Sequence, residues 1–181
     1  DRLSSILSRF SEPETLKMAK LGRELRAKGV DVIDLSLGEP DFDTPAHIKA
    51  AAKKAIDDNW SLYTPVAGYT HLREAVCEKF RRDNHLEYKP ENIVVSTGSK
   101  QSLANVILAL VDDGEEVIIP TPYWVTYSEL VKIARGKVVE IHTTLESGYK
   151  ISPAQLEQAI TPKTKAFLFS SPCNPSGAVY N

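Results

Sequence analysis

The sequence predicts an α/β fold, an α/β/α sandwich around a mostly parallel sheet. In the second half of the chain, short runs rich in β-branched residues alternate with longer segments of helical period, as in βαβ units. The composition, 42% hydrophobic and 25% charged, is that of a globular protein. At 181 residues the chain is long enough for one good core, in one domain or in parts of two. We expect parallel strands joined by right-handed connections.

The first half of the chain is predicted to be mainly helical. A helical pattern over residues 14–28 ends at Gly29, and the branched residues of 30–37 indicate a strand or an extended segment. Thr44 is a suitable N-cap, and Pro45 suits the first position of the helix that follows. The apolar residues that predict the three helices of this half are Met18, Leu21, Leu25, Ile48, Ala52, Ala55, Ile56, Leu72, Val76 and Phe80.

From residue 92 onward we expect strands and helices to alternate. The expected strands are 93–95, 117–119, 138–141 and 166–169. The expected helices begin near Ser99, span 123–135, and follow a capping box formed by Ser152, Pro153, Ala154 and Gln155. The predicted core contains Ile93, Val95, Ile107, Ile118, Leu130, Phe167 and Phe169.

Several classes of protein are disfavoured by the composition. The 22 basic and 24 acidic residues nearly balance, so the net charge does not indicate binding to nucleic acid or to a membrane surface. Cys77 and Cys173 lack the spacing of a zinc site or a disulfide framework, and the four histidines are scattered. The apolar runs are too short to span a bilayer, and no secretory signal is evident. We therefore expect a cytoplasmic protein without a metal.

The candidate chemistry lies at the carboxyl ends of the expected strands, where ligands of parallel sheets bind. Gly98, Ser99 and Lys100 stand where the first of these strands turns into a helix. Backbone N–H groups, a hydroxyl and a lysine at a helix N-terminus suit a phosphate group. The first glycine of a Walker motif is missing, and a plain strand-to-helix turn fits the same residues.

The second loop carries Trp124, shortly after the expected strand 117–119. Its indole can offer a flat face to a ligand ring. The alternative is that Trp124 and Tyr123 only cap the core.

The third loop reads SSPCNPSG and follows the last expected strand. Pro172 and Pro175 restrict the backbone on both sides of Asn174, and Gly177 permits a turn. A pre-positioned amide can donate a hydrogen bond to a ligand oxygen, although an asparagine that merely closes a turn is common. Together the three loops offer a phosphate cradle, a stacking plane and an oxygen donor, which is the set that a flat, phosphorylated, phenol-like cofactor needs.

Five segments at consistent spacing resemble the N-terminal portion of class I aminotransferases, the fold type I enzymes that use pyridoxal 5'-phosphate (PLP). They read LGEPDFDTP, YTPVAGYTHLREAV, STGSKQSL, PYWVTY and SPCNPSGAVY. The similarity extends along nearly the whole chain and is greatest to the bacterial type of aspartate aminotransferase. The resemblance implies an N-terminal arm and helix of the small domain over residues 1–40. Residues 41–181 would then be the first, incomplete part of the large PLP-binding domain.

The resemblance also implies roles for individual residues. Trp124 would stack on the pyridine ring, Asn174 would bond its phenolic oxygen, and Tyr63 would reach the phosphate of a neighbouring subunit in a homodimer. The implied cofactor-binding residues are Tyr63, Gly98, Ser99, Lys100, Trp124 and Asn174. The implied substrate-binding residues are Gly38, through its backbone at the α-carboxylate, Lys100, at the distal carboxylate of an acidic substrate, Trp124 and Asn174.

Two departures from the family pattern stand out. The usual NSPNNPTG reads SSPCNPSG here, with Ser170 and Cys173 in place of asparagines, while Asn174 is kept. The catalytic Schiff-base lysine, the acidic partner of the pyridine nitrogen and the arginine for the substrate α-carboxylate are all expected beyond Asn181. The absence of an initiator methionine agrees with a part of a longer chain. We therefore expect the 181-residue segment alone to be inactive.

The function that the resemblance implies is transamination of amino acids and 2-oxo acids, with L-aspartate and 2-oxoglutarate as the expected pair, by a ping-pong mechanism. Side-chain preference depends mostly on residues outside the segment, so an aminotransferase for aromatic substrates and a PLP lyase remain alternatives. A non-catalytic relative that binds PLP or only dimerises is the alternative from another class, and the intact set of Lys100, Trp124 and Asn174 argues against it.

Overall fold

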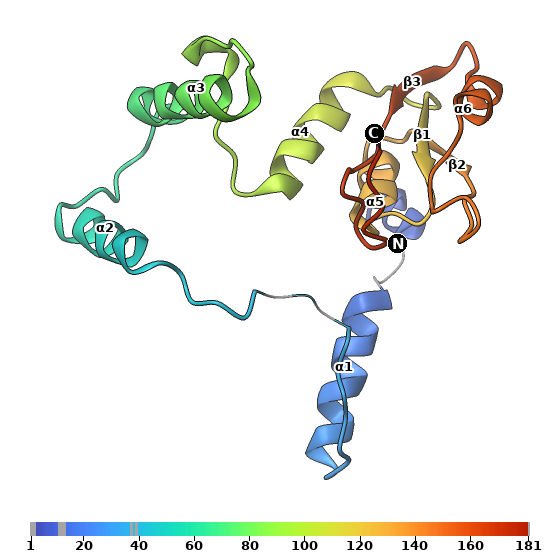
Figure 1. The fold of residues 1–181 in the computed structure, drawn as a ribbon, viewed down its shortest axis with the longest axis horizontal. Helices are drawn as coiled ribbons and strands as arrows, with labels where there is room; N and C mark the ends of the chain where they lie inside the picture. The colour runs from blue at the N-terminus through green and yellow to red at the C-terminus, as the bar shows by residue number, and fades with distance from the viewer. Residues whose placement is uncertain (1–2, 11–13, 37, 39, 181) are drawn as a thin grey trace. The chain divides into compact units, whose positions relative to one another are not determined.

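The computed structural model describes residues 3–10, 14–36, 38 and 40–180 (Figure 1). Contacts along the chain divide it into two compact units. Unit 1 comprises residues 1–17 and 98–181, and unit 2 comprises residues 18–97. The boundary expected near residue 40 separates domains of the family and not contact units, and it remains a prediction.

Unit 1 is built on a three-stranded parallel sheet in the order β2-β1-β3. The central strand carries the residues EVIIP, and all five are buried. The register pairs Ile118 of β1 with Val139 of β2 and with Phe167 of β3. The predicted α/β class with parallel strands is therefore confirmed; the strands are β1 (Glu116–Pro120), β2 (Lys137–Ile141) and β3 (Thr164–Phe167).

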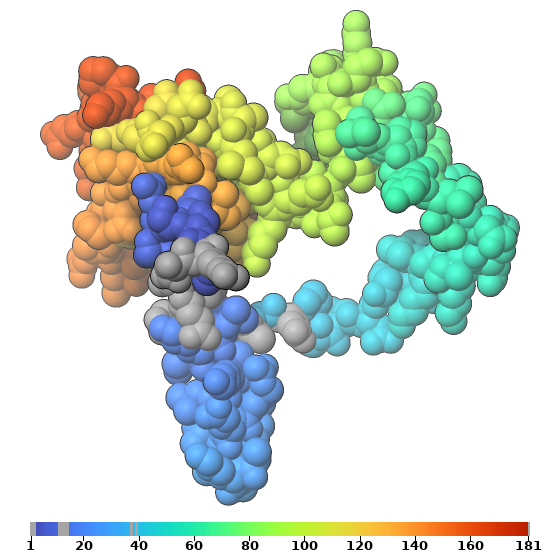
Figure 2. All heavy atoms as spheres, turned by 180° about the vertical axis from the view of Figure 1, so that it is seen from behind, coloured from blue at the N-terminus to red at the C-terminus, as the bar shows by residue number. Residues whose placement is uncertain are grey.

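The helices of unit 1 lie next to this sheet (Figure 1). The predicted capping box before α6 is present, because the Ser152 hydroxyl accepts the Gln155 N–H and the Gln155 side chain accepts the Ser152 N–H. The 3-10 helix η1 lies beside the part of unit 1 that contains α5, as the opposite views of Figures 1 and 2 agree. The helices of unit 1 are η1 (Ser5–Arg9), α4 (Ser99–Leu110), α5 (Thr126–Ile133) and α6 (Pro153–Ala159).

The core of unit 1 lies between β1 and the helices α4 and α5. Alternate residues of a strand point to opposite faces, so Val117 and Ile119 join this core while Ile118 is buried on the other face. Each such aliphatic side chain contributes about 1.5–3 kcal/mol by leaving water. The prediction that Ile107, Ile118 and Leu130 are buried is confirmed. The main cluster contains Ile107, Val111, Val117, Ile119, Tyr127, Leu130 and Val131.

Four residues expected in the core are not buried. Phe167 is half-buried because it ends the edge strand β3, and Phe169 is 45% exposed because it lies beyond this strand, which stops two residues before the predicted end; their rings stack on each other at 4.9 Å. Val95 is 38% exposed and Ile93 is half-buried. The predicted strand 93–95 is wrong as well. Its backbone makes no ladder: the Ile93 N–H donates to the Pro90 carbonyl at 3.1 Å, and the Val95 N–H donates to the Ala67 carbonyl at 3.0 Å.

Unit 2 consists of helices and connecting segments. Residues 30–36 form no strand, in agreement with the alternative of an extended segment. α2 begins one residue later than predicted, with Pro45 at the N-cap and without a side-chain cap from Thr44. The elements that precede unit 1's α4 are α1 (Glu14–Ala27), α2 (Ala46–Asp57), α3 (Thr70–Asn84) and η2 (Pro90–Asn92).

A buried carboxylate joins the three strands of unit 1 at their amino ends. The Glu116 side chain is only 8% exposed. It accepts a hydrogen bond from the Thr161 hydroxyl at 2.7 Å and one from the Lys137 ammonium at 3.0 Å. These partners, first Thr161 and then Lys137, lower the pKa of Glu116 below its usual value of 4.5.

Glu116→Gln is expected to reduce the loss of stability that acid causes. A carboxyl whose pKa is lowered by folding stabilises the native state above its unfolded pKa of 4.5, and this contribution disappears as the pH falls through the folded value. The melting temperature of the variant should therefore fall less than that of the wild type between about pH 6 and about pH 3. Glu157→Gln, at an exposed position of α6, is the control; equal acid sensitivity of all three proteins would contradict the expectation.

Candidate functional site

The N-terminus of α4 opens one side of the candidate site in unit 1. Gly98 is the N-cap, with φ of 80° and ψ of 170°, and no side chain caps the helix. Only glycine adopts this φ without strain, and a Cβ at Gly98 would meet no atom within 4 Å. The backbone is therefore open on this side, and the first N–H groups of the helix point out of its end beside Ser99 and Lys100.

Lys100 and Trp124 lie together. The Lys100 ammonium is 5.3 Å from the centroid of the Trp124 ring, which is within the range of a cation–π interaction. Trp124 is half-buried, packs against the core cluster, and meets Tyr127 edge-on at 5.7 Å. The packing agrees with the interpretation that Trp124 caps the core, and its stacking on a ligand ring stays a prediction.

Tyr123 anchors the segment that carries Trp124. Its hydroxyl donates to a Glu140 carboxylate oxygen at 2.6 Å, and Glu140 belongs to β2. Burial, followed by this hydrogen bond, raises the pKa of Tyr123 above its usual value of 10. The phenol therefore stays protonated and keeps donating at neutral pH, which fixes the segment to the sheet.

The loop that carries Asn174 is closed by its own hydrogen bonds. The Cys173 N–H donates to the Ala178 carbonyl at 2.8 Å, and the Gly177 N–H donates to the Cys173 carbonyl at 2.7 Å. The Asn174 N–H donates to the Ser170 hydroxyl oxygen at 3.2 Å. Asn174 itself is exposed, so its amide is accessible at the end of a loop with a defined shape.

Further bonds hold this loop to the rest of unit 1. The Tyr180 N–H donates to the Ser171 hydroxyl, and the Tyr180 hydroxyl accepts the Ile151 N–H at 3.0 Å. The Cys173 thiol lies 3.3 Å from the Pro122 carbonyl oxygen, to which it donates. Residues of the Trp124 segment and of the Asn174 loop are thus in direct contact.

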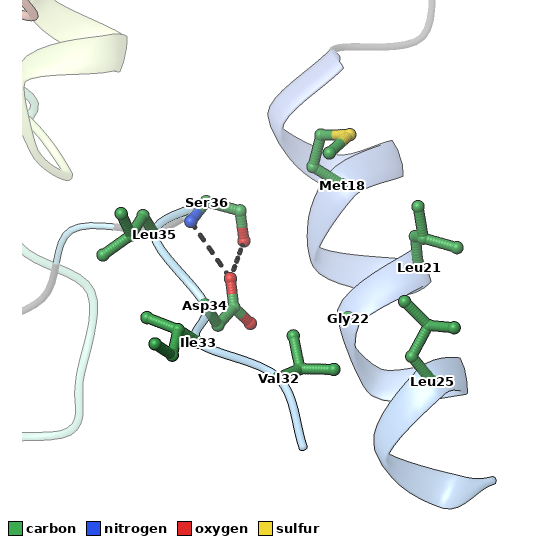
Figure 3. Close-up of a pocket in the computed structure, with 9 residues that line it drawn as sticks. All are labelled: Met18, Leu21, Gly22, Leu25, Val32, Ile33, Asp34, Leu35 and Ser36. Atoms are coloured by element: carbon green, nitrogen blue, oxygen red, sulfur yellow. Dashed lines mark hydrogen bonds between the residues drawn. The ribbon is translucent and has the colours of Figure 1, made fainter. Parts of the chain in front are cut away.

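The other two predicted site residues belong to unit 2. Tyr63 and Gly38 are exposed. In the segment before Gly38, Asp34 accepts hydrogen bonds from the Ser36 N–H at 3.0 Å and from the Ser36 hydroxyl at 2.6 Å (Figure 3). Asp34 also pairs with Arg26 at 3.3 Å. The bonds from Ser36, followed by the charge of Arg26, lower the pKa of Asp34.

This segment and α1 line an apolar groove of about 400 Å³ (Figure 3). Gly22 lies close to Asp34 here: a Cβ at Gly22 would lie 3.0 Å from an Asp34 carboxylate oxygen, so a larger residue would push on that side chain. The groove has no cationic side chain in its lining to hold a phosphate, so it does not provide the candidate chemistry. Its lining residues are Met18, Leu21, Gly22, Leu25, Val32, Ile33, Asp34, Leu35 and Ser36.

The structure adds residues that the sequence interpretation did not select. Ser170 and Cys173, noted there only as departures from a pattern, both hold the Asn174 loop through their side chains. Tyr123 and Tyr180 anchor the two loops from their ends. The Ser170 bond spans four residues and is readable from spacing, whereas the partners of Cys173 and Tyr123 are 51 and 17 residues away.

The donor set in unit 1 fits PLP. Backbone N–H groups, a hydroxyl and an ammonium at the end of α4 suit the phosphate, and the uncovered side of Gly98 leaves room for it. The indole of Trp124 suits the ring, and the exposed amide of Asn174 suits an oxygen. Among the described residues no group of three or more acidic, histidine or cysteine side chains could hold a metal ion. None of the described helices has the length and apolar character needed to cross a membrane.

Comparison with known sequences shows which proteins this chain is similar to. The profile of the family described as "Aminotransferase class I and II" matches residues 30–181. The aspartate/prephenate aminotransferase of Cereibacter sphaeroides is 51% identical over 178 residues, which are 98% of this chain and 44% of that protein. The aspartate aminotransferase of Bacillus subtilis is 46% identical over 179 residues, which are 99% of this chain and 46% of that protein.

Solved structures give the same result. The aspartate aminotransferase from Thermus thermophilus with maleate matches with a TM-score of 0.95 and 46% identity, over 100% of this chain and 47% of that one. The aspartate aminotransferase from Rhizobium meliloti matches with a TM-score of 0.95 and 45% identity, over 100% of this chain and 45% of that one. The chain thus spans a little under half the length of the relatives it matches.

Proposed function

The chain belongs to the class I and II aminotransferase family, and from this premise we propose that the protein transfers the amino group of L-aspartate to 2-oxoglutarate with PLP as cofactor. Class I aminotransferases use PLP. The products are oxaloacetate and L-glutamate, formed in two half-reactions with amino acid and 2-oxo acid substrates. Support for aspartate comes from the relatives at about half identity, which are named for it.

The observation that carries the proposal is the pairing of Lys100 with Trp124 at the N-terminus of α4. An ammonium 5.3 Å from an indole, next to an uncapped helix end, combines sites for an anion and for a flat ring within one unit. A phosphorylated aromatic cofactor needs both kinds of site, one for its phosphate and one for its ring.

Bound PLP supplies an electron sink that stabilises negative charge at the substrate Cα. The residues of this chain bind and orient it. Gly98, Ser99 and Lys100 hold the phosphate, Trp124 stacks on the ring, and Asn174 donates its amide N–H to the phenolic oxygen. Lys100 also attracts the distal carboxylate of aspartate, and the Gly38 backbone meets the α-carboxylate.

The proposal extends to the assembly and the domains. Tyr63 reaches the PLP phosphate of a second copy, so the enzyme acts as a homodimer with shared sites. Its fully exposed side chain is available for such a contact. Residues 1–40 belong to the small domain and residues 41–181 begin the large one.

Prephenate is a second candidate for the 2-oxo acid that accepts the amino group. The observation that favours it is the name of the relative from Cereibacter sphaeroides, an aspartate/prephenate aminotransferase at 51% identity. Parallel assays with 2-oxoglutarate and with prephenate as acceptors for the amino group of aspartate distinguish a narrow enzyme from one of this broader kind.

The first test of the proposal is borohydride reduction of the purified full-length protein with PLP, followed by intact mass and peptide mapping. We expect one phosphopyridoxyl group per chain on a lysine beyond Asn181, together with aspartate:2-oxoglutarate activity. The 181-residue segment alone should show neither, because the catalytic lysine is expected elsewhere. Specific labelling of Lys100, or full activity of the segment, would overturn the assignment of roles. A full-length protein without any adduct or activity would overturn the function itself.

A further inference from the structure

The thiol of Cys173 bridges two loops that leave neighbouring strands. β1 and β3 are paired, and their ladder ends where the Leu168 N–H donates to the Ile118 carbonyl at 2.9 Å. Beyond this point the chain continues to Pro122 on one side and to Cys173 on the other. The contact of the Cys173 sulfur with the Pro122 carbonyl oxygen, at 3.3 Å, joins the loops after the ladder has ended.

Cys173 is also the closing residue of its own loop. Its N–H and its carbonyl bond Ala178 and Gly177 at 2.8 Å and 2.7 Å, so the backbone on its C-terminal side cannot turn independently. Asn174 is the next residue. A displacement of Cys173 therefore moves Asn174 with it, and the thiol bond transmits the position of Pro122 to the Asn174 amide.

On the other side of the bridge, Pro122 is two residues before Trp124. Tyr123, between them, is fixed to β2 through Glu140. The Pro122 carbonyl is thus held in place by its neighbour Tyr123. Cys173 is half-buried, which limits competition from water for its weak S–H donor.

We propose that Cys173 is a positioning residue of the PLP site, whose thiol fixes the separation between the amide of Asn174 and the ring of Trp124. The inference rests on the proposed function. Cys173 does not touch the cofactor; it acts through the two residues that do. A residue that donates to Pro122 is needed at this position, and serine can meet that requirement where alanine cannot.

The experiment compares Cys173→Ala, Cys173→Ser and the control Cys77→Ser in the full-length protein. Cys77 is the other free, half-buried cysteine and lies on α3 of unit 2. The measurements are the Kd for PLP by equilibrium dialysis, the pH midpoint of the bound cofactor's colour change, and the melting temperature.

We expect Cys173→Ala to raise the Kd by about three- to tenfold, as the loss of one hydrogen bond would. The pH midpoint should rise, because weaker donation by Asn174 disfavours the negatively charged phenolic oxygen. Cys173→Ser should stay within about twofold of the wild type on both readouts, as should Cys77→Ser.

Three results overturn the inference alone: an unchanged Kd in Cys173→Ala, equal weakening by alanine and serine, or a lower melting temperature with unchanged Kd and pH midpoint. The last would show a role in stability only. A wild-type protein that binds no PLP overturns the proposed function and this inference together, so the two failures are distinguishable.

Discussion

Asn174→Ala is expected to lower kcat/KM for the aspartate:2-oxoglutarate reaction by about 10²–10³-fold, the usual loss when a pre-organised donor to a developing charge is removed. The Asn174 loop is closed by the Cys173, Ala178 and Gly177 backbone bonds, and these do not involve the side chain of Asn174. The substitution should therefore leave the loop intact and remove only the amide. Steady-state kinetics at saturating PLP, with the Kd for PLP measured separately, provide the test.

The controls separate the loss of the donor from other effects. Asn174→Asp keeps the size of the side chain but replaces the N–H donor by a negative charge, so its activity should fall at least as far. Asn105→Ala, at an exposed position of α4, should keep activity within about twofold. A loss below about tenfold in Asn174→Ala would show that the amide is not a donor to the reacting system.

Gly136→Ala should lower the free energy of unfolding by about 2–3 kcal/mol, near the upper end for overpacking in a core. A Cβ at Gly136 would lie 2.7 Å from Val111 Cγ1, 3.0 Å from Val131 Cγ1 and 3.2 Å from the Glu115 carbonyl oxygen. Val131 is completely buried and the carbonyl belongs to the backbone, so neither neighbour can move freely. Urea denaturation with the midpoint and slope fitted together measures the change.

A double-mutant cycle identifies the cause. Val111→Ala removes the methyl group that would be nearest to the new Cβ, so Gly136→Ala should be less costly in that background than in the wild type. Equal costs in both backgrounds would contradict crowding against Val111 and point to the contacts with Val131 and with the Glu115 carbonyl.

The sequence was sufficient where the decisive interactions are local. The Ser152 capping box spans three residues, and it formed as predicted. The run EVIIP is apolar on both faces, as a strand buried on both sides must be, and it became the central strand. The loops with Trp124 and Asn174 were predicted to follow strands, and they follow β1 and β3; Lys100 was also predicted to follow a strand, and among the described residues no strand precedes it, although all three residues lie in unit 1.

The failures concern features that depend on distant partners. Residues 93–95 have the branched composition of a strand but form no ladder with another strand, because composition does not tell which neighbour is available. Phe167 and Phe169 look like core residues, yet Phe167 ends an edge strand and Phe169 lies beyond it. The contacts of Cys173 with Pro122 and of Tyr123 with Glu140 cross between loops and strands and leave no trace in local spacing.

The Glu116 junction has a consequence for the order in which unit 1 assembles. Its partner on β2, Lys137, is 21 residues away, while its partner before β3, Thr161, is 45 residues away. Closing the longer loop costs about 0.6 kcal/mol more for each doubling of length, and short-range pairings form faster. Assembly therefore favours β1, α5 and β2 as an early nucleus, with β3 docking afterwards. The Asn174 loop follows β3, so the last part of unit 1 to become ordered is the part to which the proposed cofactor would contribute its own binding energy.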